Sequence, residues 1–436
     1  MPKKAKKSFQ SVKGMADILP QSQPYWEFLR QCVHKTAQAY GFERIDTPIL
    51  EDEDLFKVSA GESSDIVQKQ MYSFKSKGGD NLVLRPEGTA PIMRSYIEHG
   101  MVNMPQPLKL YYMGPFFRYE QPQGGRYRQF YQFGFEVLGE ESPVVDAQLV
   151  NIYINIMKEV GFKNIEAQVN SIGCKECRPK FRSALVAYYK HNINKVCKDC
   201  RKRVKSNPLR VLDCKDEKCL QLKQRAPQTL DYLCDPCQRH FKYVLEYLDE
   251  LEIPYVLNPH LVRGLDYYTK TVFEFFLKEK DEAQPEGAEA PSFAVGGGGR
   301  FDNLGDVVGN KKVFSAGMAG GMERIVYFMK KMEIKVPAGP QPHVFIAQLG
   351  DMGKKKSLKL FENLRTKGIR PVEFFGKDSI KSQLRIADKM GIKHTLILGQ
   401  KEALDGNIIL RDMESGIQEL FPMDRIVDEI KKRLKK

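Results

Sequence analysis

Two long strand-like segments joined by a short polar loop are the feature that most restricts how this chain folds. Leu108–Tyr119 and Gln129–Leu138 are rich in aromatic residues, which favour strands. The nine residues between them include one proline, two adjacent glycines, Arg126 and Arg128, so we expect a mobile, cationic loop. Strands joined by so short a connection pair antiparallel. These segments therefore predict an antiparallel sheet.

Other segments before residue 337 add strands and helices. Tyr267–Lys278 is an aromatic, β-branched strand, and Phe293–Val295 resumes a strand leading into four glycines after a polar loop at 281–291. Apolar residues at helical spacing predict a helix over 25–40, which Gly41 ends. We also predict short strands at 42–50 and 82–85, and helices at 90–98, 145–160 and 322–332.

Three prolines at 337, 340 and 342 mark a linker, after which the pattern changes. The βαβ order beyond it predicts a small α/β domain from about 340 to 436. Residues 341–436 hold 20 Lys and Arg against 13 Asp and Glu. This surplus suits contact with a polyanion, but taken alone it is more often a solvated basic surface. The predicted strands are 343–348, 372–375, 394–398 and 407–411, and the predicted helices are 354–367, 380–390 and 423–434.

Eight of the nine cysteines fall in one stretch of mostly helix-favouring sequence, at about 166–256. Three of their four pairs have C-x-x-C spacing, which lets two thiolates reach one tetrahedral metal ion. Two interpretations stay open: zinc sites, or reduced and partly buried thiols in a helical insert. The pairs are Cys174/Cys177, Cys197/Cys200, Cys214/Cys219 and Cys234/Cys237, and Cys32 stands apart.

Composition narrows the class of protein. Hydrophobic residues make up 42% and charged residues 28% of 436 residues, which indicates a folded globular protein rather than a disordered one. No uncharged apolar run approaches the roughly 18 residues of a membrane span, and the lysine-rich N-terminus lacks a secretory signal. We therefore predict a cytoplasmic protein. The net charge of +14 favours a polyanionic partner.

Four arginines lie in short, unusual sequence contexts, whereas the familiar nucleotide-binding motifs are absent. An enzyme that uses ATP without those motifs must hold phosphates with side chains, and a guanidinium offers a fork of donors matched to phosphate oxygens. Each arginine taken singly is more often a surface or salt-bridged residue. The four are Arg85 in Arg-Pro-Glu-Gly-Thr, Arg118 in Phe-Phe-Arg-Tyr-Glu, Arg263 in Val-Arg-Gly-Leu-Asp-Tyr-Tyr and Arg324 in Gly-Met-Glu-Arg-Ile.

Taken together, these segments resemble the class II aminoacyl-tRNA synthetases, and within them the histidyl-tRNA synthetase family, over essentially the whole chain. The helix and strand ending at Pro48 resemble motif 1, Phe117–Glu120 with the following loop and strand resembles motif 2, and Gly320–Arg324 resembles motif 3. Leu261–Tyr268 and Phe293–Asp302 resemble segments peculiar to the histidine enzymes. The second has Phe293-Ala294 and an additional glycine, which leaves its strand register open.

The resemblance implies an α+β fold, with an antiparallel-sheet catalytic core, a helical insert and a C-terminal α/β anticodon-binding domain. It divides the chain into core residues 1–165, a Cys-rich insert at 166–256, core residues 257–336 and an anticodon-binding domain at 340–436. It also implies a homodimer built through motif 1, and histidine tRNA as a partner. The loop 121–128 would approach the acceptor end of that tRNA.

The resemblance also implies residue roles. Histidine would be activated with ATP and then transferred to the 3′ end of the tRNA, with Mg²⁺ on the outer phosphates. Arg118 would bridge the α-phosphate and the histidine carboxylate, Arg263 would reach the α-phosphate from the other side, and Arg324 would bind the γ-phosphate. Glu120 would orient the adenine amino group. The histidine-binding residues would be Glu87, Gly88, Thr89 and Gln132 around the α-amino group, and Glu136, Tyr267 and Tyr268 around the imidazole.

Two alternatives share this fold. One is a non-enzymatic paralogue that serves as a regulatory subunit of a histidine-biosynthesis transferase, which typically lacks the anticodon domain and the arginine motifs. The other is an RNA-binding protein that uses the fold without catalysis. The presence of both the arginines and the basic C-terminal domain in this sequence favours the enzyme.

Overall fold

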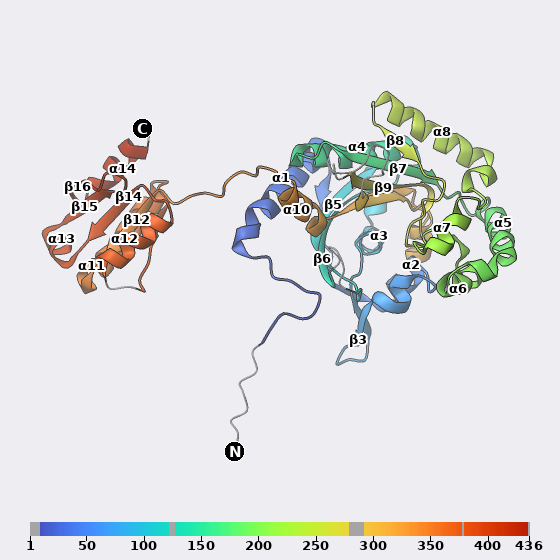
Figure 1. Cartoon of the computed structure of the whole chain (residues 1–436), viewed down its shortest axis with the longest axis horizontal. Helices are drawn as coiled ribbons and strands as arrows, with labels where there is room; N and C mark the ends of the chain where they lie inside the picture. The colour runs from blue at the N-terminus through green and yellow to red at the C-terminus, as the bar shows by residue number, and fades with distance from the viewer. Residues whose placement is uncertain (1–8, 122–126, 279–291, 377–378, 435–436) are drawn as a thin grey trace, which may run out of the picture. The chain divides into compact units, whose positions relative to one another are not determined.

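The computed structural model describes residues 9–121, 127–278, 292–376 and 379–434. The chain divides into two compact units, Met1–Val336 and Pro337–Lys436 (Figure 1). Among the described residues, none of the helices combines the length and the apolar character that crossing a membrane requires.

An eight-stranded sheet forms the centre of the first unit, in the order β1-β5-β6-β11-β10-β9-β7-β8. Its long strands pair antiparallel, and the parallel pairs β1–β5 and β7–β8 lie at its two edges. The predicted antiparallel sheet and α+β fold are thus confirmed. The strands are β1 Glu43–Arg44, β5 Leu108–Phe117, β6 Gln129–Leu138, β7 Ile165–Ser171, β8 Tyr255–Leu257, β9 Thr269–Lys278, β10 Ser292–Arg300 and β11 Ser315–Gly321.

The alternation of side chains along β5 and β6 separates two faces of this sheet. Tyr111 and its partner Phe135 contribute to an apolar layer that also contains residues of α1 (Gln23–Ala39), α4 (Val144–Val160) and α10 (Met322–Lys331). Tyr112, one position along, belongs to a second cluster on the opposite face with residues of α3 (Thr89–Glu98). From Tyr131 to Val137, strand β6 has aromatic or apolar residues at odd positions and Gln132, Gly134 and Glu136 at even ones, so Gln132 and Glu136 lie on the α3 face.

A buried ion pair ties α4 to the end of β10. Arg300 donates from Nε and Nη2 to Oδ2 of Asp146, at 3.0 and 2.8 Å, and both side chains are fully buried. Burial alone would favour the neutral acid, but the charge of Arg300 holds the pKa of Asp146 well below its usual range. Since both charges are paired and hydrogen-bonded, the contact holds the two elements in one arrangement.

The Cys-rich segment begins later and ends earlier than the predicted 166–256. Strand β7 belongs to the central sheet, where it pairs with β9, and β8 returns to β7. The helices between them have a separate small core that includes Phe181, Leu185 and Tyr189. The helical insert therefore lies between Ser171 and Tyr255. Its helices are α5 Arg178–His191, α6 Lys198–Ser206, α7 Glu217–Lys223 and α8 Asp235–Glu250.

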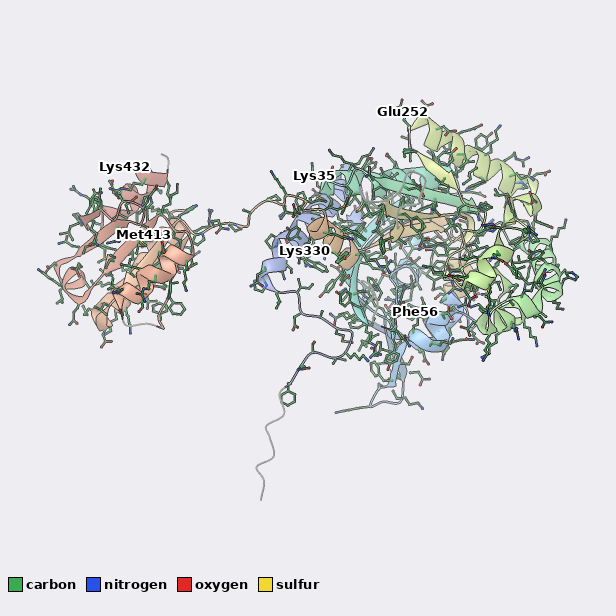
Figure 2. All side chains as sticks on the ribbon, in the orientation of Figure 1. Lys35, Phe56, Glu252, Lys330, Met413 and Lys432 are labelled. Carbon is green, nitrogen blue, oxygen red and sulfur yellow. The ribbon has the colours of Figure 1, made fainter. Side chains whose placement is uncertain are left out.

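The strand predicted at 42–50 is wrong as one element. Residues 43–44 form β1 of the central sheet, whereas β2 (Leu50–Asp52) joins a separate three-stranded sheet with β4 (Asn81–Leu84) and β3 (Tyr72–Lys75). Pro48 lies between them and has no N–H to donate to a ladder. Helix α2 (Glu53–Ala60) packs on this small sheet through the buried side chain of Phe56, which is labelled in Figure 2.

The second unit is a five-stranded mixed sheet in the order β13-β12-β14-β15-β16 with helices packed against it, which confirms the predicted α/β domain. Two elements were missed, α13 (Gln400–Asp405) and β16 (Gln418–Pro422). Strand β16 lies at the sheet edge with four of its five residues exposed, so it carries no apolar alternation. The others are β12 Val344–Gln348, β13 Pro371–Glu373, β14 His394–Leu398, β15 Asn407–Asp412, α11 Gly350–Thr366, α12 Ile380–Lys389 and α14 Ile426–Leu434.

We expect Tyr153→Phe to leave the free energy of unfolding unchanged or to raise it by about 1 kcal/mol. The Tyr153 ring stacks on Phe275 at 3.9 Å between centroids, while its buried hydroxyl has no hydrogen-bond partner among the described residues. Removing an unsatisfied polar group relieves its desolvation penalty without loss of packing. Urea denaturation of both proteins measures the effect, with Phe275→Leu as a destabilising control. A loss of more than about 1 kcal/mol in Tyr153→Phe would show that the hydroxyl is hydrogen-bonded.

Candidate active site

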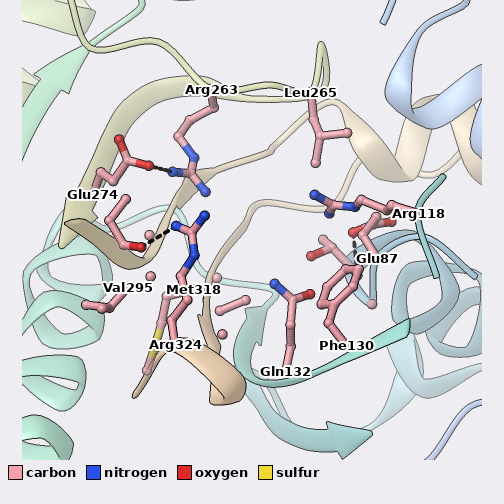
Figure 3. Close-up of a pocket in the computed structure, with 18 of the residues that line it drawn as sticks. Glu87, Arg118, Phe130, Gln132, Arg263, Leu265, Glu274, Val295, Met318 and Arg324 are labelled. Carbon is pink, nitrogen blue, oxygen red and sulfur yellow. Dashed lines mark hydrogen bonds and ion pairs between the residues drawn. The ribbon is translucent and has the colours of Figure 1, made fainter. Parts of the chain in front are cut away.

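A pocket of about 280 Å³ opens on the α3 face of the central sheet. Its floor comes from β6, β9, β10 and β11, and its wall from the loop that carries Arg263, Tyr267 and Tyr268. Figure 3 shows the side chains of Arg118, Arg263 and Arg324 directed into it. Every residue to which the family resemblance gave a catalytic, histidine-binding or ATP-binding role lines this pocket, except Glu136, which lies directly beneath it.

Two buried carboxylates lie at the end of the pocket nearest α3. Glu87 accepts hydrogen bonds from the backbone N–H groups of Thr89 and Ala90, at 2.8 and 2.9 Å, and from the hydroxyl of Tyr267 at 3.3 Å. The first two bonds satisfy N–H groups that are otherwise unpaired at the start of α3. Burial raises the pKa of Glu87 despite these donors, because little water solvates its charge.

Glu136 is the more unusual of the two. Its Oε1 accepts a hydrogen bond from the Thr89 hydroxyl at 2.8 Å, whereas its fully buried Oε2 has no partner among the described residues. Burial raises the pKa of Glu136 well above its ordinary value, and the nearby charge of Glu87 acts in the same direction. An unsatisfied buried oxygen of this kind is costly unless a ligand supplies a donor.

Three arginines supply positive charge across the pocket. Arg118 donates from Nε to the carbonyl oxygen of Pro86 at 2.8 Å and lies over the Phe130 ring. Arg263 donates from Nη1 to Glu274 at 3.2 Å, and Arg324 donates to the carbonyl oxygen of Ala294 at 2.6 Å (Figure 3). Each guanidinium is thus held by a protein acceptor, which fixes its orientation before any anion binds.

Arg85, the fourth arginine considered from the sequence, does not line the pocket. Its guanidinium donates to the carbonyl and hydroxyl oxygens of Thr47 and to the carbonyl of Pro115, at 2.8, 2.9 and 3.1 Å. It lies against the Phe116 ring, 4.6 Å from the centroid. Arg85 therefore braces the strands beside the pocket, and its assignment as a possible phosphate ligand is wrong.

Small residues in the floor leave room for the side chains above it. A Cβ on Gly317 would collide with Oε2 of Glu136, and one on Gly297 would lie 2.6 Å from Nη1 of Arg263. The glycine-rich run at 296–299 forms part of β10, rather than a loop after it. The glycines therefore let the side chains of Glu136 and Arg263 lie close against the sheet.

Sequence reasoning missed several lining residues, among them Tyr112, Phe130, Glu274 and Glu323. Glu323 accepts a backbone hydrogen bond from Tyr131 through both carboxylate oxygens, and burial raises its pKa to about 7. Glu274 offered a usable signal, since it is an isolated acid within an aromatic strand, as Glu136 is.

Arg126 of the predicted cationic loop lies outside the described residues. Arg128 at its end stacks on Tyr119 and donates to the carbonyl oxygen of Glu120 at 3.2 Å.

The arrangement suits a ligand with anionic groups at one side and hydrogen-bond donors at the other. The guanidinium groups can stabilise charge that develops on phosphoryl oxygens in a preorganised, partly dry site. Groups of three or more side chains able to hold a metal ion occur, within the described residues, only in two cysteine clusters outside the pocket. The pocket by itself therefore presents a cationic surface rather than a built metal centre.

The comparisons with known proteins agree with this geometry. Residues 14–325 match the model of the family described as histidyl-tRNA synthetase, and residues 343–433 match that of the anticodon binding domain. The chain is 44% identical to the histidine–tRNA ligase of Dehalococcoides mccartyi over 98% of this chain and all of that protein. It is 42% identical to that of Syntrophotalea carbinolica, over 96% of this chain and 97% of the relative.

Solved structures show the same likeness. The apo histidyl-tRNA synthetase of S. aureus superimposes with a TM-score of 0.78 at 34% identity, covering 97% of this chain and all of that one. A Bacillus halodurans protein described as an ATP phosphoribosyltransferase regulatory subunit/histidyl-tRNA synthetase shares the fold, with a TM-score of 0.62 at 19% identity over 90% of this chain and 98% of that one.

Proposed function

The chain belongs to the histidyl-tRNA synthetase family and is a histidine–tRNA ligase, and we propose that the pocket on the α3 face is where it activates histidine. Such a ligase first joins a carboxylate oxygen of L-histidine to the α-phosphorus of ATP, and the bond from that phosphorus to the bridging oxygen of pyrophosphate breaks. The histidyl group then passes to the 3′ end of the tRNA.

In this proposal the three arginines overcome the repulsion between two anions. The histidine carboxylate must approach a triphosphate, and negative charge builds on the α-phosphoryl oxygens in the transition state. Arg118 bridges the carboxylate and the α-phosphate, Arg263 faces the α-phosphate from the opposite side, and Arg324 binds the γ-phosphate. Their support is the convergence of the three guanidinium groups on one pocket, each oriented by a protein acceptor.

Recognition of the histidine side chain rests on Glu136, and this is the observation that carries the proposal. A buried carboxylate oxygen without a partner needs an N–H donor, which an imidazole ring supplies and an aliphatic side chain does not. Tyr267 and Tyr268 flank the ring, while Glu87, Gly88, Thr89 and Gln132 surround the ammonium group. Amino acids without such a donor are rejected because they leave Glu136 unsatisfied.

ATP is the second substrate, and we propose that Glu120 orients its adenine amino group. Mg²⁺ accompanies the outer phosphates. It fits a pocket whose carboxylates are already engaged, Glu87 by α3, Glu274 by Arg263 and Glu323 by Tyr131, because Mg²⁺ is commonly held by substrate phosphates and water. The ion would neutralise phosphate charge while the side chains of this chain position the reacting groups.

The second unit would bind the anticodon of histidine tRNA, as its match to the anticodon binding domain and its basic charge suggest. We further propose a homodimer through the motif 1 region, where Ile49 and Leu50 are exposed apolar residues, and a cytoplasmic location. The regulatory-paralogue alternative fits less well, because this chain has both the pocket arginines and a complete second unit.

Histidine-dependent ATP–pyrophosphate exchange tests the proposed activation. We expect exchange with histidine and ATP in the absence of tRNA, because the adenylate forms within the first unit alone. The other amino acids provide the controls, and histidinol, which lacks the carboxylate, should compete without supporting exchange. Equal exchange with several amino acids, or none with histidine, would contradict the assignment of the pocket.

A further inference from the structure

We propose that the helical insert binds two structural zinc ions, each through four cysteine thiolates. The first, here called the terminal site, is formed by Cys174, Cys177, Cys234 and Cys237. The second, the inner site, is formed by Cys197, Cys200, Cys214 and Cys219. In each site the four sulfur atoms lie within 4.8 Å of one another. The eight cysteines therefore pair across the insert into two compact groups.

The distances between the sulfurs fit a single tetrahedral ion. The Sγ–Sγ distance is 3.5 Å for Cys174–Cys177, and 3.8 Å for Cys174–Cys234, Cys177–Cys237 and Cys197–Cys214. Four thiolates around zinc, with bonds of about 2.3 Å, have sulfur–sulfur edges of about 3.8 Å. A disulfide requires about 2.05 Å, so none is formed. A tetrahedral set of four sulfurs selects zinc over the harder metals.

The backbone around the sulfurs has the form expected at a thiolate site. The N–H of Cys174 points at Sγ of Cys177 at 3.0 Å, and the N–H of Glu176 at Sγ of Cys174 at 3.4 Å. The inner site repeats this pattern, with the N–H of Cys200 3.4 Å from Sγ of Cys197. Such N–H donors stabilise the negative charge of metal-bound thiolates by hydrogen bonding to the sulfur atoms. The turn before Cys174 requires a glycine at position 173 for two reasons. Its φ is +67°, and a Cβ there would lie only 2.6 Å from Sγ of Cys177.

Charge near the terminal site supports metal-bound thiolates over neutral packed thiols. The Nε of Arg178 is buried and has no hydrogen-bond partner among the described residues. Asp266 and three of the terminal-site cysteines, Cys174, Cys177 and Cys237, are the acidic groups whose charges would act on this guanidinium. Zinc bound by four thiolates carries a net charge of −2, whereas four thiols carry none. A buried guanidinium is accommodated better beside the charged site.

Each zinc site would cross-link the insert, and the inner site lies within the stretch of chain that the terminal site closes. The terminal site joins the residues where the chain enters the insert, just before α5, to those at the start of α8, 60 residues later. The inner site ties α6 and α7 together inside that span. The insert core is small, and cross-links are the common means by which small units become stable.

The terminal site is also connected to the pocket through hydrogen bonds to a pocket loop. Arg178, which follows Cys177 directly, donates from Nη2 to the carbonyl oxygen of Tyr268. Nearby in the insert, Asn207 donates to Asp266 at 3.0 Å. Both acceptors belong to the loop that carries Arg263. We therefore expect the zinc sites to have a structural role that includes holding this loop in place.

Metal analysis of the full-length protein, purified without chelator, tests the proposal. We expect two zinc ions per chain by inductively coupled plasma mass spectrometry. Stepwise modification of the thiols with a mercurial should release both ions to a zinc-sensitive dye, because binding requires deprotonated cysteines. Less than one ion per chain, or an intact mass that shows disulfides, would overturn the proposal, and a single ion would overturn one of the two sites.

Paired variants assign the ions to their sites. Cys174→Ser with Cys177→Ser, and separately Cys197→Ser with Cys200→Ser, should each lower the content from two ions to one. Cys32→Ser is the matched control, since Cys32 is a buried cysteine of α1 outside both clusters, and it should retain two. Where a double variant does not fold, mercurial titration of the wild-type protein still counts the ions. Full zinc content in either double variant would contradict the ligand assignment.

Discussion

Arg263→Ala should lower the kcat of histidine activation by about 10²–10³-fold, while the KM for histidine changes little. Removal of one preorganised donor from a site where charge develops typically has an effect of about this size. Arg263 is partly buried, lies near the Tyr268 ring and is oriented by Glu274 at 3.2 Å. Although burial opposes its charge, Tyr268 and Glu274 raise the pKa of Arg263, so it is cationic throughout the working pH range.

Steady-state ATP–pyrophosphate exchange measures this effect, and Arg365→Ala is the matched control. Arg365 is an exposed arginine of the second unit that pairs with Glu362, so its removal should leave kcat unchanged. Arg263→Lys should recover only part of the loss, because an ammonium cannot bond Glu274 and a phosphoryl oxygen with the same planar fork. A large rise in KM with normal kcat in Arg263→Ala would instead indicate uniform substrate binding.

A protein that ends at Val336 should retain pyrophosphate exchange but lose tRNA charging, with kcat/KM for tRNA lower by about 10²-fold. The first unit contains the whole pocket, so, under the proposed assignment, we expect activation to take place without the second unit. The second unit carries a surplus of basic residues, and contacts of basic residues with phosphates supply much of the affinity for nucleic acid. We therefore expect the loss to appear mainly as a higher KM for tRNA.

Salt dependence separates this explanation from a general loss of folding. The KM of the full-length protein for tRNA should rise steeply with salt, and that of the truncated protein less steeply, because fewer phosphate contacts remain. Oligomeric state must be compared by sedimentation, since a weakened dimer would also lower exchange. Unchanged KM for tRNA in a truncated protein of unchanged oligomeric state would mean that the second unit does not bind tRNA.

The pocket residues were predicted from the family resemblance, and local pattern supports those on β6. The period of two along β6 separates Gln132 and Glu136 from the apolar residues between them, and this alternation is visible in the sequence. The predicted strand pair and the α/β order of the second unit follow from equally local signals. The edge strand β16 escaped notice because an exposed strand has no apolar alternation to detect.

Two arginines illustrate which information local sequence pattern does not contain. Arg85 and Arg118 have equally distinctive sequence contexts, yet Arg118 faces the pocket and Arg85 braces Thr47 and Pro115. The direction of each guanidinium depends on which strands lie beside it. Glu274 and Tyr112 likewise become pocket residues only because β9 and β5 share one sheet with β6.

The sequence by itself determined the antiparallel strands, the α/β second unit, the alternation of polar and apolar residues along β6 and the pairing of cysteines at C-x-x-C spacing. All of these depend on residues near one another in the chain, where side-chain period and turn geometry leave few choices. Only the tertiary structure decided that Cys174 and Cys177 meet Cys234 and Cys237, rather than the cysteines of the inner site. It also places Arg118, Arg263 and Arg324 in one pocket, which the sequence indicated only through its resemblance to a family. The reason is that contacts between distant segments depend on how the sheet orders its strands, and no local pattern records that order.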